Sequence, residues 1–270
     1  MSTLERFMKQ IDIHLVSWNR LPMTELVIKT IKRNTKPESY RLVVLDNGSD
    51  GDVPDRLQEL HDSGLIDEYI PIKSNLGLEA ARNLLLNNCT QSDYFICADN
   101  DCLPPPPYRG KDWVERLYEL MKKYPDYAAI AARTQVMIGT GNIFEAADEA
   151  GDDIVDFPWP GGSLRIMDTK LVYHVGGWAR GAEGRGQEER YICGRLHDFG
   201  FKTAFATKVK TLHLFGMPDT DRWGYDKNLK PEDTGHSDIS HPALENGDDY
   251  KEVAKYCGKE LADAYCGDQK

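Results

Sequence analysis

The first half of the chain alternates between short apolar runs and amphipathic segments, and this order constrains the fold more than any other feature. Each apolar run has the length of a buried strand, and each amphipathic segment has the length and apolar spacing of a helix. The predicted strands are residues 11–18, 40–47, 66–74 and 94–101, and the predicted helices are residues 21–34, 53–64, 78–89 and 111–125. This alternation predicts an α/β fold with a mostly parallel sheet flanked by helices on both faces.

The second half of the chain is less regular. A further strand is predicted at 128–139, and the acidic residues 140–160 are expected to be irregular. The segments that follow are a strand, a short helix and a glycine-rich loop (161–177), a loop leading into a helix (183–200), and strand and turn material (201–216). Residues 217–270 are polar, with one or two helices predicted near the end, and we expect them to form a C-terminal helical appendage.

Polar clusters follow three of the predicted strands. They are Trp18-Asn19-Arg20, Asp46-Asn47-Gly48-Ser49 and Asp99-Asn100-Asp101. Because ligands of parallel α/β sheets bind at the carboxyl ends of the strands, these clusters predict a site at one edge of the sheet.

The last of these clusters has the residue types of a metal site. Asp99 and Asp101 are hard oxygen ligands, one residue apart, which suit Mg²⁺ or Mn²⁺ completed by substrate phosphates. A polar turn is the simpler interpretation of this pair, and D-N-G-S at 46–49 is also good turn chemistry. Arg82, just inside a predicted helix, either pairs with a diphosphate or is an ordinary surface arginine.

Composition narrows the class of protein. The net charge of the 270 residues is −11, which does not suit tight, nonspecific binding of a polyanion. The sequence has no apolar run of about 18 residues, so we predict no membrane-spanning helix. Its N-terminus has no basic-then-apolar signal pattern, and its six cysteines form no CxxC pair. Together these features indicate a cytoplasmic protein with free thiols.

The order of the motifs is more specific than any one of them. From residue 11 to 216 the sequence runs "VSWNR", "LDNGSDG", "NLGLEAARN", "DND", "GGSLRIMDTKLVYHVGGW", "GQEERYICGR" and "VKTLHL". This series resembles the family-2-type glycosyltransferases, which have the GT-A fold. The resemblance implies a nucleotide-binding half at about 1–103 and an acceptor half at about 104–216, with 217–270 as a possible lid or acceptor segment.

The resemblance also implies roles for individual residues. It implies that Asp101, Asp99 and His213 bind a divalent metal, Mn²⁺ or Mg²⁺. It implies that Glu189 or Glu188 is the base that removes the proton of an acceptor hydroxyl in an inverting reaction. The residues that it places around a nucleotide-diphosphate-sugar donor are Asn19, Arg20, Asp46, Asn47, Gly77, Arg82, Asp99, Asn100 and Trp178.

The sequence departs from the family pattern around the acidic pair. The pair is Glu-Glu rather than Glu-Asp, Tyr191 stands at the next acidic position, and Gln187 stands at the preceding glycine. These departures leave open which glutamate is the base and whether the reaction inverts. Trp178 either stacks on a sugar or packs in the core.

The acceptor and two other functions also stay open at this point. A hexose or pentose could pass to a glycan, a protein or a hydroxymethylated DNA base, with residues 140–160 and 217–245 as an acceptor wall carrying Trp159, Trp223 and Tyr225. One alternative is a catalytically silent protein that binds a nucleotide-sugar or glycan, and the retained acidic residues argue against it. The other is a nucleotidyltransferase, but "SWNRLPMT" lacks the Gly-rich basic loop of that class.

Overall fold

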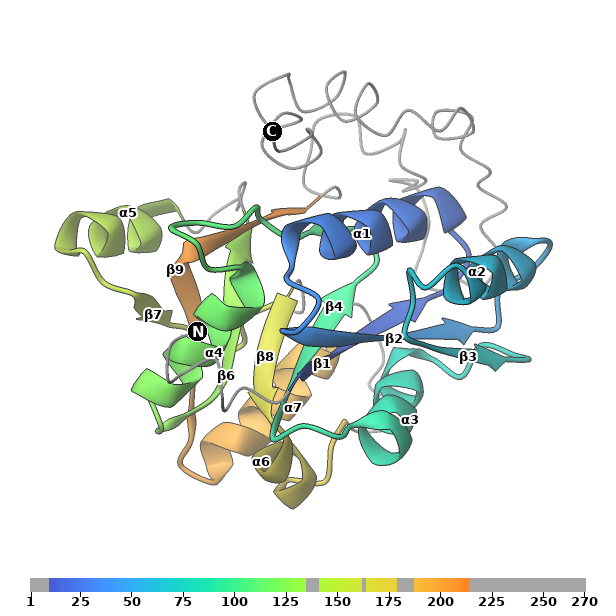
Figure 1. The fold of residues 1–270 in the computed structure, drawn as a ribbon. Coiled ribbons are helices and arrows are strands. Elements are labelled where there is room, and N and C mark those ends of the chain that lie inside the picture. Colours follow the sequence, from blue (N-terminus) through green and yellow to red (C-terminus); the bar gives the residue numbers. More distant parts are fainter. Residues whose placement is uncertain (1–9, 135–140, 162–163, 179–186, 214–270) are drawn as a thin grey trace.

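The computed structural model describes residues 10–134, 141–161, 164–178 and 187–213 (Figure 1). Its strands are β1 (Ile11–Ser17), β2 (Tyr40–Asn47), β3 (Glu68–Ile72), β4 (Tyr94–Asp99), β5 (Cys102–Leu103), β6 (Tyr127–Thr134), β7 (Ile154–Asp156), β8 (Leu164–Asp168) and β9 (Lys202–His213). Its helices are α1 (Leu21–Asn34), α2 (Val53–Asp62), α3 (Leu78–Cys89), α4 (Trp113–Lys123), α5 (Gly141–Ala150), α6 (Thr169–His174) and α7 (Gln187–Asp198). The predicted appendage at 217–270 lies outside the described residues.

The strands form one large sheet in the order β3-β2-β1-β4-β8-β6-β9-β5, and β7 pairs with β9. The neighbours from β3 to β4 are parallel, as the alternation predicts. β8 is antiparallel to both of its neighbours, β4 and β6, whereas β6 and β9 are parallel. The sheet is therefore parallel in the first half of the chain and mixed in the second.

Helices cover both faces of this sheet, which gives three layers (Figure 1). On one face, α1, α2 and α4 pack on strand residues such as Ile13, Leu42 and Ile130. On the other face, α3, α6 and α7 pack on residues such as Val43 and Phe95. The predicted α/β architecture is confirmed. None of the helices that the structure describes is both long and apolar enough to span a bilayer.

The expectation of an irregular segment at 140–160 is wrong. This segment contains α5 and β7, and β7 pairs with β9 in antiparallel orientation. In α5, Phe144 and Ala147 are buried, and Phe144 lies edge-on to Phe205 at a ring distance of 5.6 Å. The acidic residues around these apolar positions made the segment look irregular in the sequence, although the side of α5 that carries Phe144 packs on the sheet.

Candidate active site

The register of the sheet brings the three predicted polar clusters to one edge. Ser17, the last residue of β1, pairs with Asp46 of β2, and Val16 pairs with Asp99 of β4. The segments that leave these strands therefore begin side by side. This alignment follows from parallel pairing, because the carboxyl ends of all parallel strands lie at the same edge.

A cavity of about 500 Å³ opens at this edge. Its wall includes seven of the predicted site residues, namely Arg20, Asn47, Gly77, Asp99, Asn100, Asp101 and Glu188. It also includes Val16, Trp18, Asn75 and Leu78. A space of this size holds a ligand of several hundred daltons.

The predicted metal ligands Asp101 and His213 meet although they are 112 residues apart in the sequence. The short strand β5 pairs with the end of β9, which aligns Cys102 with His213. His213 Nε2 lies 3.4 Å from Asp101 Oδ1. One ligand atom from each of Asp101, Cys102 and His213 lies within 4.8 Å of the others. The predicted pairing of this aspartate with the late histidine is thus present in the structure.

The chemistry of this group of residues fits a hard or borderline divalent cation. A carboxylate and an imidazole are suitable ligands for Mn²⁺. Burial raises the pKa of the Cys102 thiol well above its usual range, with the charge of Asp101 adding to the effect. A thiol held in its protonated form is a poor ligand, so Asp101 and His213 are the donors that the cation would use.

The charges around the cavity also favour a cation. Asp99, Asp101 and Glu188 line it together with one arginine, Arg20. The pKa of Asp99 is raised to about 6, mainly by burial and in part by the charges of Asp101 and Glu189, while Arg82 and His213 oppose the rise. Carboxylates gathered in this way resist ionising together, and a divalent cation relieves that repulsion.

Arg82 does not line the cavity. Its side chain is 3% exposed, and Nη2 donates to Asp99 Oδ1 at 2.9 Å. The guanidinium also lies 5.8 Å from the centre of the Trp178 ring. The structure therefore gives Arg82 the role of a partner that orients Asp99, rather than that of a group exposed to a diphosphate.

Trp178 is also buried, with 2% of its surface exposed. Its ring lies edge-on to Phe95 at 6.2 Å. Asn83 holds its backbone, because Asn83 Nδ2 donates to the Trp178 carbonyl at 2.7 Å and the Trp178 N–H donates to Asn83 Oδ1 at 2.9 Å. Trp178 therefore packs in the core and does not stack on a sugar in the cavity.

Other predicted donor-binding residues shape the loops of the site. The backbone N–H of Asn19 donates to Ser49 Oγ at 2.7 Å, which joins the loops after β1 and β2. Asp46 is 1% exposed and accepts from the backbone N–H of Ser49 at 3.1 Å, so its carboxylate caps the turn. Asn47 lines the cavity and accepts from the N–H of Leu76 at 3.0 Å.

The acidic pair of α7 lies in the first turn of that helix, with Glu188 7% and Glu189 9% exposed. Glu188 lines the cavity. Burial raises the pKa of Glu188 to about 7, and the negative charge of Glu189 adds to this rise. Burial acts in the same direction on Glu189, but the positive charges of Arg82 and Arg165, together with hydrogen bonds from Glu188 and the backbone, outweigh it and lower the pKa of Glu189. At neutral pH the two carboxyls therefore differ in protonation. Glu189 is ionised, whereas Glu188 is close to its pKa and is partly protonated.

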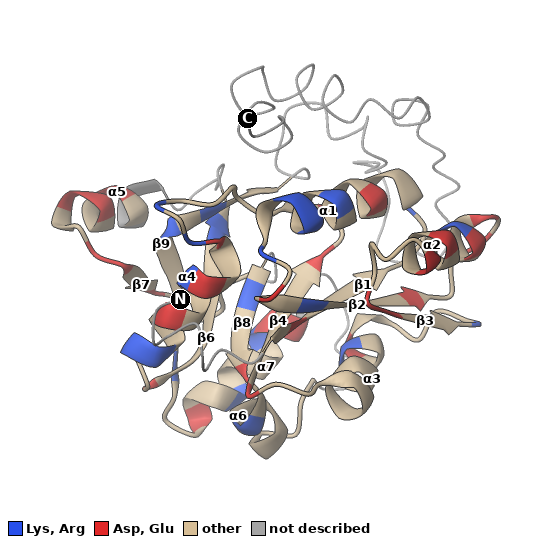
Figure 2. Ribbon diagram, in the orientation of Figure 1, with Lys and Arg blue, Asp and Glu red and all other residues tan. Residues whose placement is uncertain are grey.

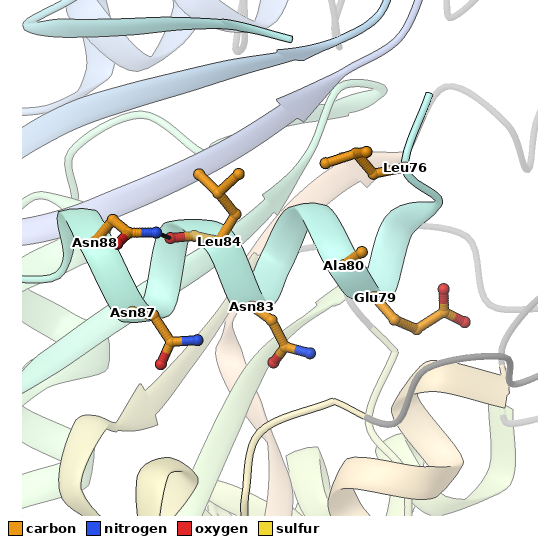
Figure 3. A pocket seen from close by; sticks show the side chains of 7 residues that line it. All are labelled: Leu76, Glu79, Ala80, Asn83, Leu84, Asn87 and Asn88. Atoms are coloured by element: carbon orange, nitrogen blue, oxygen red, sulfur yellow. Dashed lines mark hydrogen bonds between the residues drawn. The ribbon is translucent and has the colours of Figure 1, made fainter. Parts of the chain in front are cut away.

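A second hollow of about 500 Å³ lies along the outer side of α3 (Figure 3). It is lined by Leu76, Glu79, Ala80, Asn83, Leu84, Asn87 and Asn88. Both ends of the Asn83 amide are already bonded to Trp178, and Asn88 Nδ2 donates to the Leu84 carbonyl at 3.0 Å. No charged cluster like that of the first cavity appears among these described residues, so the chemistry lies at the strand ends.

The sequence was compared with known families and proteins. The model of the glycosyl transferase family 2 matches residues 12–180, which is more than half of the chain. The chain belongs to this family. The predicted glycosyltransferase identity and the GT-A fold are confirmed. No curated protein gives a match.

Two similar solved structures illustrate the fold. One is the mannosyltransferase PcManGT of Pyrobaculum calidifontis in complex with GDP-Man and Mn²⁺, with a TM-score of 0.63 and 14% identity over 80% of this chain. The other is GalNAc-T7 with UDP, GalNAc and Mn²⁺, with a TM-score of 0.59 and 14% identity over 77% of this chain. The match spans 59% and 44% of these two proteins, respectively.

Trp18 is part of the cavity wall, and the sequence placed it in a polar cluster at a strand end without assigning it a role. Two residues near the cavity, Cys102 and Arg165, did not stand out in the sequence. Cys102 lies beside the predicted metal ligands, and its place next to Asp101 could have suggested it. Arg165 interrupts an otherwise apolar strand, "LRIM", which is the pattern of a buried charge with a specific partner.

Proposed function

We propose that this family-2 glycosyltransferase uses a divalent metal to transfer a sugar from a nucleotide-diphosphate-sugar to a hydroxyl acceptor with inversion at the anomeric carbon. The observation that carries the proposal is the pairing of Asp101 with His213, at 3.4 Å, beside a cavity lined by further carboxylates. The Mn²⁺ and nucleotide ligands of the two similar structures support the choice of metal and donor.

The donor would occupy the cavity with its diphosphate next to the metal ligands. Asp101 and His213 would hold Mn²⁺ or Mg²⁺, and Asp99, oriented by Arg82, would complete the acidic side of the site. The metal would neutralise the charge that develops on the departing nucleoside diphosphate. Arg20, on the cavity wall, supplies the other positive charge that a diphosphate requires.

The glutamate pair supplies the base. Glu188 lines the cavity, and a pKa near 7 is well matched to accepting a proton at neutral pH. The acceptor hydroxyl gives its proton to the Glu188 carboxylate while its oxygen forms a bond to the anomeric carbon. The bond from that carbon to the diphosphate oxygen breaks in the same step, so the configuration inverts. Glu189, the other member of the pair, has a lowered pKa and would stay ionised beside it.

A thermal-shift experiment tests the donor and the metal together. The 270-residue protein is heated with GDP- and UDP-sugars, each with Mn²⁺ and with EDTA. A nucleotide-sugar at a hundredfold excess over its dissociation constant stabilises the folded state by about 2.7 kcal/mol. We expect this stabilisation with Mn²⁺, and its loss in Asp101→Ala and in His213→Ala.

Two matched substitutions control for unrelated effects. Asp93→Ala removes an exposed aspartate, and His174→Ala removes an exposed histidine at the end of α6. Both should respond to the donor as the wild type does. Slow release of free sugar from the donor, measured by chromatography, then separates a transferase from a protein that only binds. Stabilisation by the donor in EDTA, or in both metal-ligand variants, would contradict the proposed site.

A further inference from the structure

Arg165 is a charged residue in the centre of the sheet. It lies on β8, where it pairs with Cys97 of β4 on one side and with Ala131 of β6 on the other. Its side chain is fully buried. Figure 2 shows the basic stretch of β8 among uncharged parts of the neighbouring strands. Burying a guanidinium at such a position is costly unless a specific partner offsets the loss of hydration.

Only one of the three guanidinium nitrogens of Arg165 has a described hydrogen bond. Nη1 donates to the carbonyl of Pro160 at 2.9 Å. Nε and Nη2 are buried and have no hydrogen-bond partner within the structure. One carbonyl does not balance a full positive charge, so the compensating charge must come from a carboxylate close to this face of the sheet.

Helix α7 brings a carboxylate to that face. Cys193 of α7 packs in the same apolar cluster as Cys97 and Met167, and residues 165 and 167 point to the same side of β8. Glu189 precedes Cys193 by one helical turn, so both face the sheet. Glu189 Oε2 is buried and, like Arg165 Nε and Nη2, has no hydrogen-bond partner within the structure.

We propose that Arg165 is a positioning residue, whose buried guanidinium faces Glu189 and supplies the counter-charge for its carboxylate, so that Glu188 serves as the base. This inference rests on the proposed function for its catalytic meaning, but the charge interaction between the two buried side chains can be tested without it. Arg165 lies outside the set of residues that the family motifs indicate for donor or metal binding.

The surroundings of Glu189 show why this arginine is needed. Burial raises the pKa of Glu189, whereas the charges of Arg82 and Arg165, together with hydrogen bonds from Glu188 and the backbone, bring it below its usual value. Arg82 is also bonded to Asp99, so its charge is shared between two carboxylates. The titratable and charged groups that act on Glu189 are Arg82 on α3, Cys97 and Asp99 on β4, Arg165 on β8, and Glu188 and Cys193 on α7.

The test measures the titration of the pair directly. Protein labelled with ¹³C at the glutamate carboxyl carbon is titrated by NMR without any substrate, and Glu189→Gln assigns the signal. In Arg165→Met, which keeps the volume and removes the charge, the lower titration step of the pair should move up by about one to three pH units. In Arg165→Lys, which keeps the charge, it should stay within a few tenths of a unit of the wild type.

A second arginine provides the matched control. Arg133 on β6 is also largely buried, but it pairs with Asp148 of α5 at 2.9 Å instead of with the glutamates. Arg133→Met should leave the titration of the pair unchanged. If Arg165→Met leaves the lower step where it is, or if Arg133→Met moves it as far, Arg165 does not hold Glu189 and the proposal is wrong.

Unfolding measurements keep the test valid if Arg165→Met is poorly stable. If the two buried charges offset each other, removing one leaves the other uncompensated. Arg165→Met and Glu189→Gln should then each lower the urea midpoint. Combining them should lower it by less than the sum of the two effects. Additive effects would overturn the proposal. Neither experiment needs donor or metal. If Arg165 and Glu189 are coupled but the thermal-shift experiment shows no nucleotide binding, the proposed function is wrong while the role of Arg165 stands.

Discussion

His14 gives the structure a measurable dependence of stability on pH. It lies on β1, is 3% exposed, and stacks on Phe95 with a ring distance of 5.1 Å. Its Nε2 is buried without a hydrogen-bond partner in the structure. Burial lowers the pKa of His14 to about 4, with the charge of Asp12 opposing this change and that of Arg41 adding to it. The folded protein therefore keeps this imidazole neutral.

The sign and size of the effect follow from linkage. Below the unfolded pKa of 6.5, the unfolded chain binds a proton at His14 that the folded chain does not bind, so the free energy of unfolding falls as pH falls. The loss begins near pH 6.5 and is complete at about pH 4. A shift of this size corresponds to about 3 kcal/mol, because each pKa unit is worth about 1.4 kcal/mol.

His14→Phe isolates this contribution. Phenylalanine keeps a ring to stack on Phe95, and it gives up no hydrogen bond at Nε2. Urea unfolding of both proteins between pH 7 and pH 4 should show the variant gaining about 3 kcal/mol on the wild type as the pH falls. Carboxylates titrate in both proteins, so their effects cancel in the difference.

The reasoning fails if the difference between wild type and His14→Phe is the same at pH 7 and pH 4, since the imidazole would then titrate alike in the folded and unfolded chains.

Three further substitutions test the loops and caps by urea unfolding. Gly48→Ala should cost about 2–4 kcal/mol, because Gly48 has φ of +79° and a Cβ there would lie 2.4 Å from the Ser74 carbonyl carbon. Asn83→Ala should cost about 2–3 kcal/mol, since it leaves the backbone N–H and carbonyl of Trp178 without their partners. Asp112→Ala removes the capping box of α4 and should cost about 1–2 kcal/mol. A loss below half a kilocalorie per mole in any of them would contradict the corresponding contact.

The first half of the fold could be predicted because its signals are local. The apolar run at 40–47 and the helical spacing at 21–34 match β2 and α1 without any tertiary information. In α5 the burial depends on Phe205, which is 61 residues further along the chain than Phe144. A local pattern of acidic residues cannot reveal such a partner, which is why the helix was not predicted.

The site was predicted in part for the same reason. Motif order placed Asp101 and His213 together correctly, because the family motifs already contain that long-range pairing. Motif order did not reveal that Arg82 turns inward to Asp99, or that Trp178 is buried. Those outcomes depend on which side of α3 faces the sheet and on how Asn83 holds the loop, and neither is encoded in residue spacing.

The antiparallel strand β8 explains how the second half of the chain contributes to a site built by the first. Because β8 runs against β4, its first residue, Leu164, pairs with Ala98 beside the end of β4, and its last, Asp168, pairs with Tyr94 at the other end. The chain therefore enters β8 at the edge where the cavity lies. Arg165 is one residue inside that edge, on the face of the sheet that α7 covers. A parallel strand in this place would begin at the opposite edge, and an arginine near its start would be far from the glutamate pair. The reversal of this one strand thus places Arg165 near the edge of the sheet where the cavity lies, from which we propose that it acts on the glutamate pair.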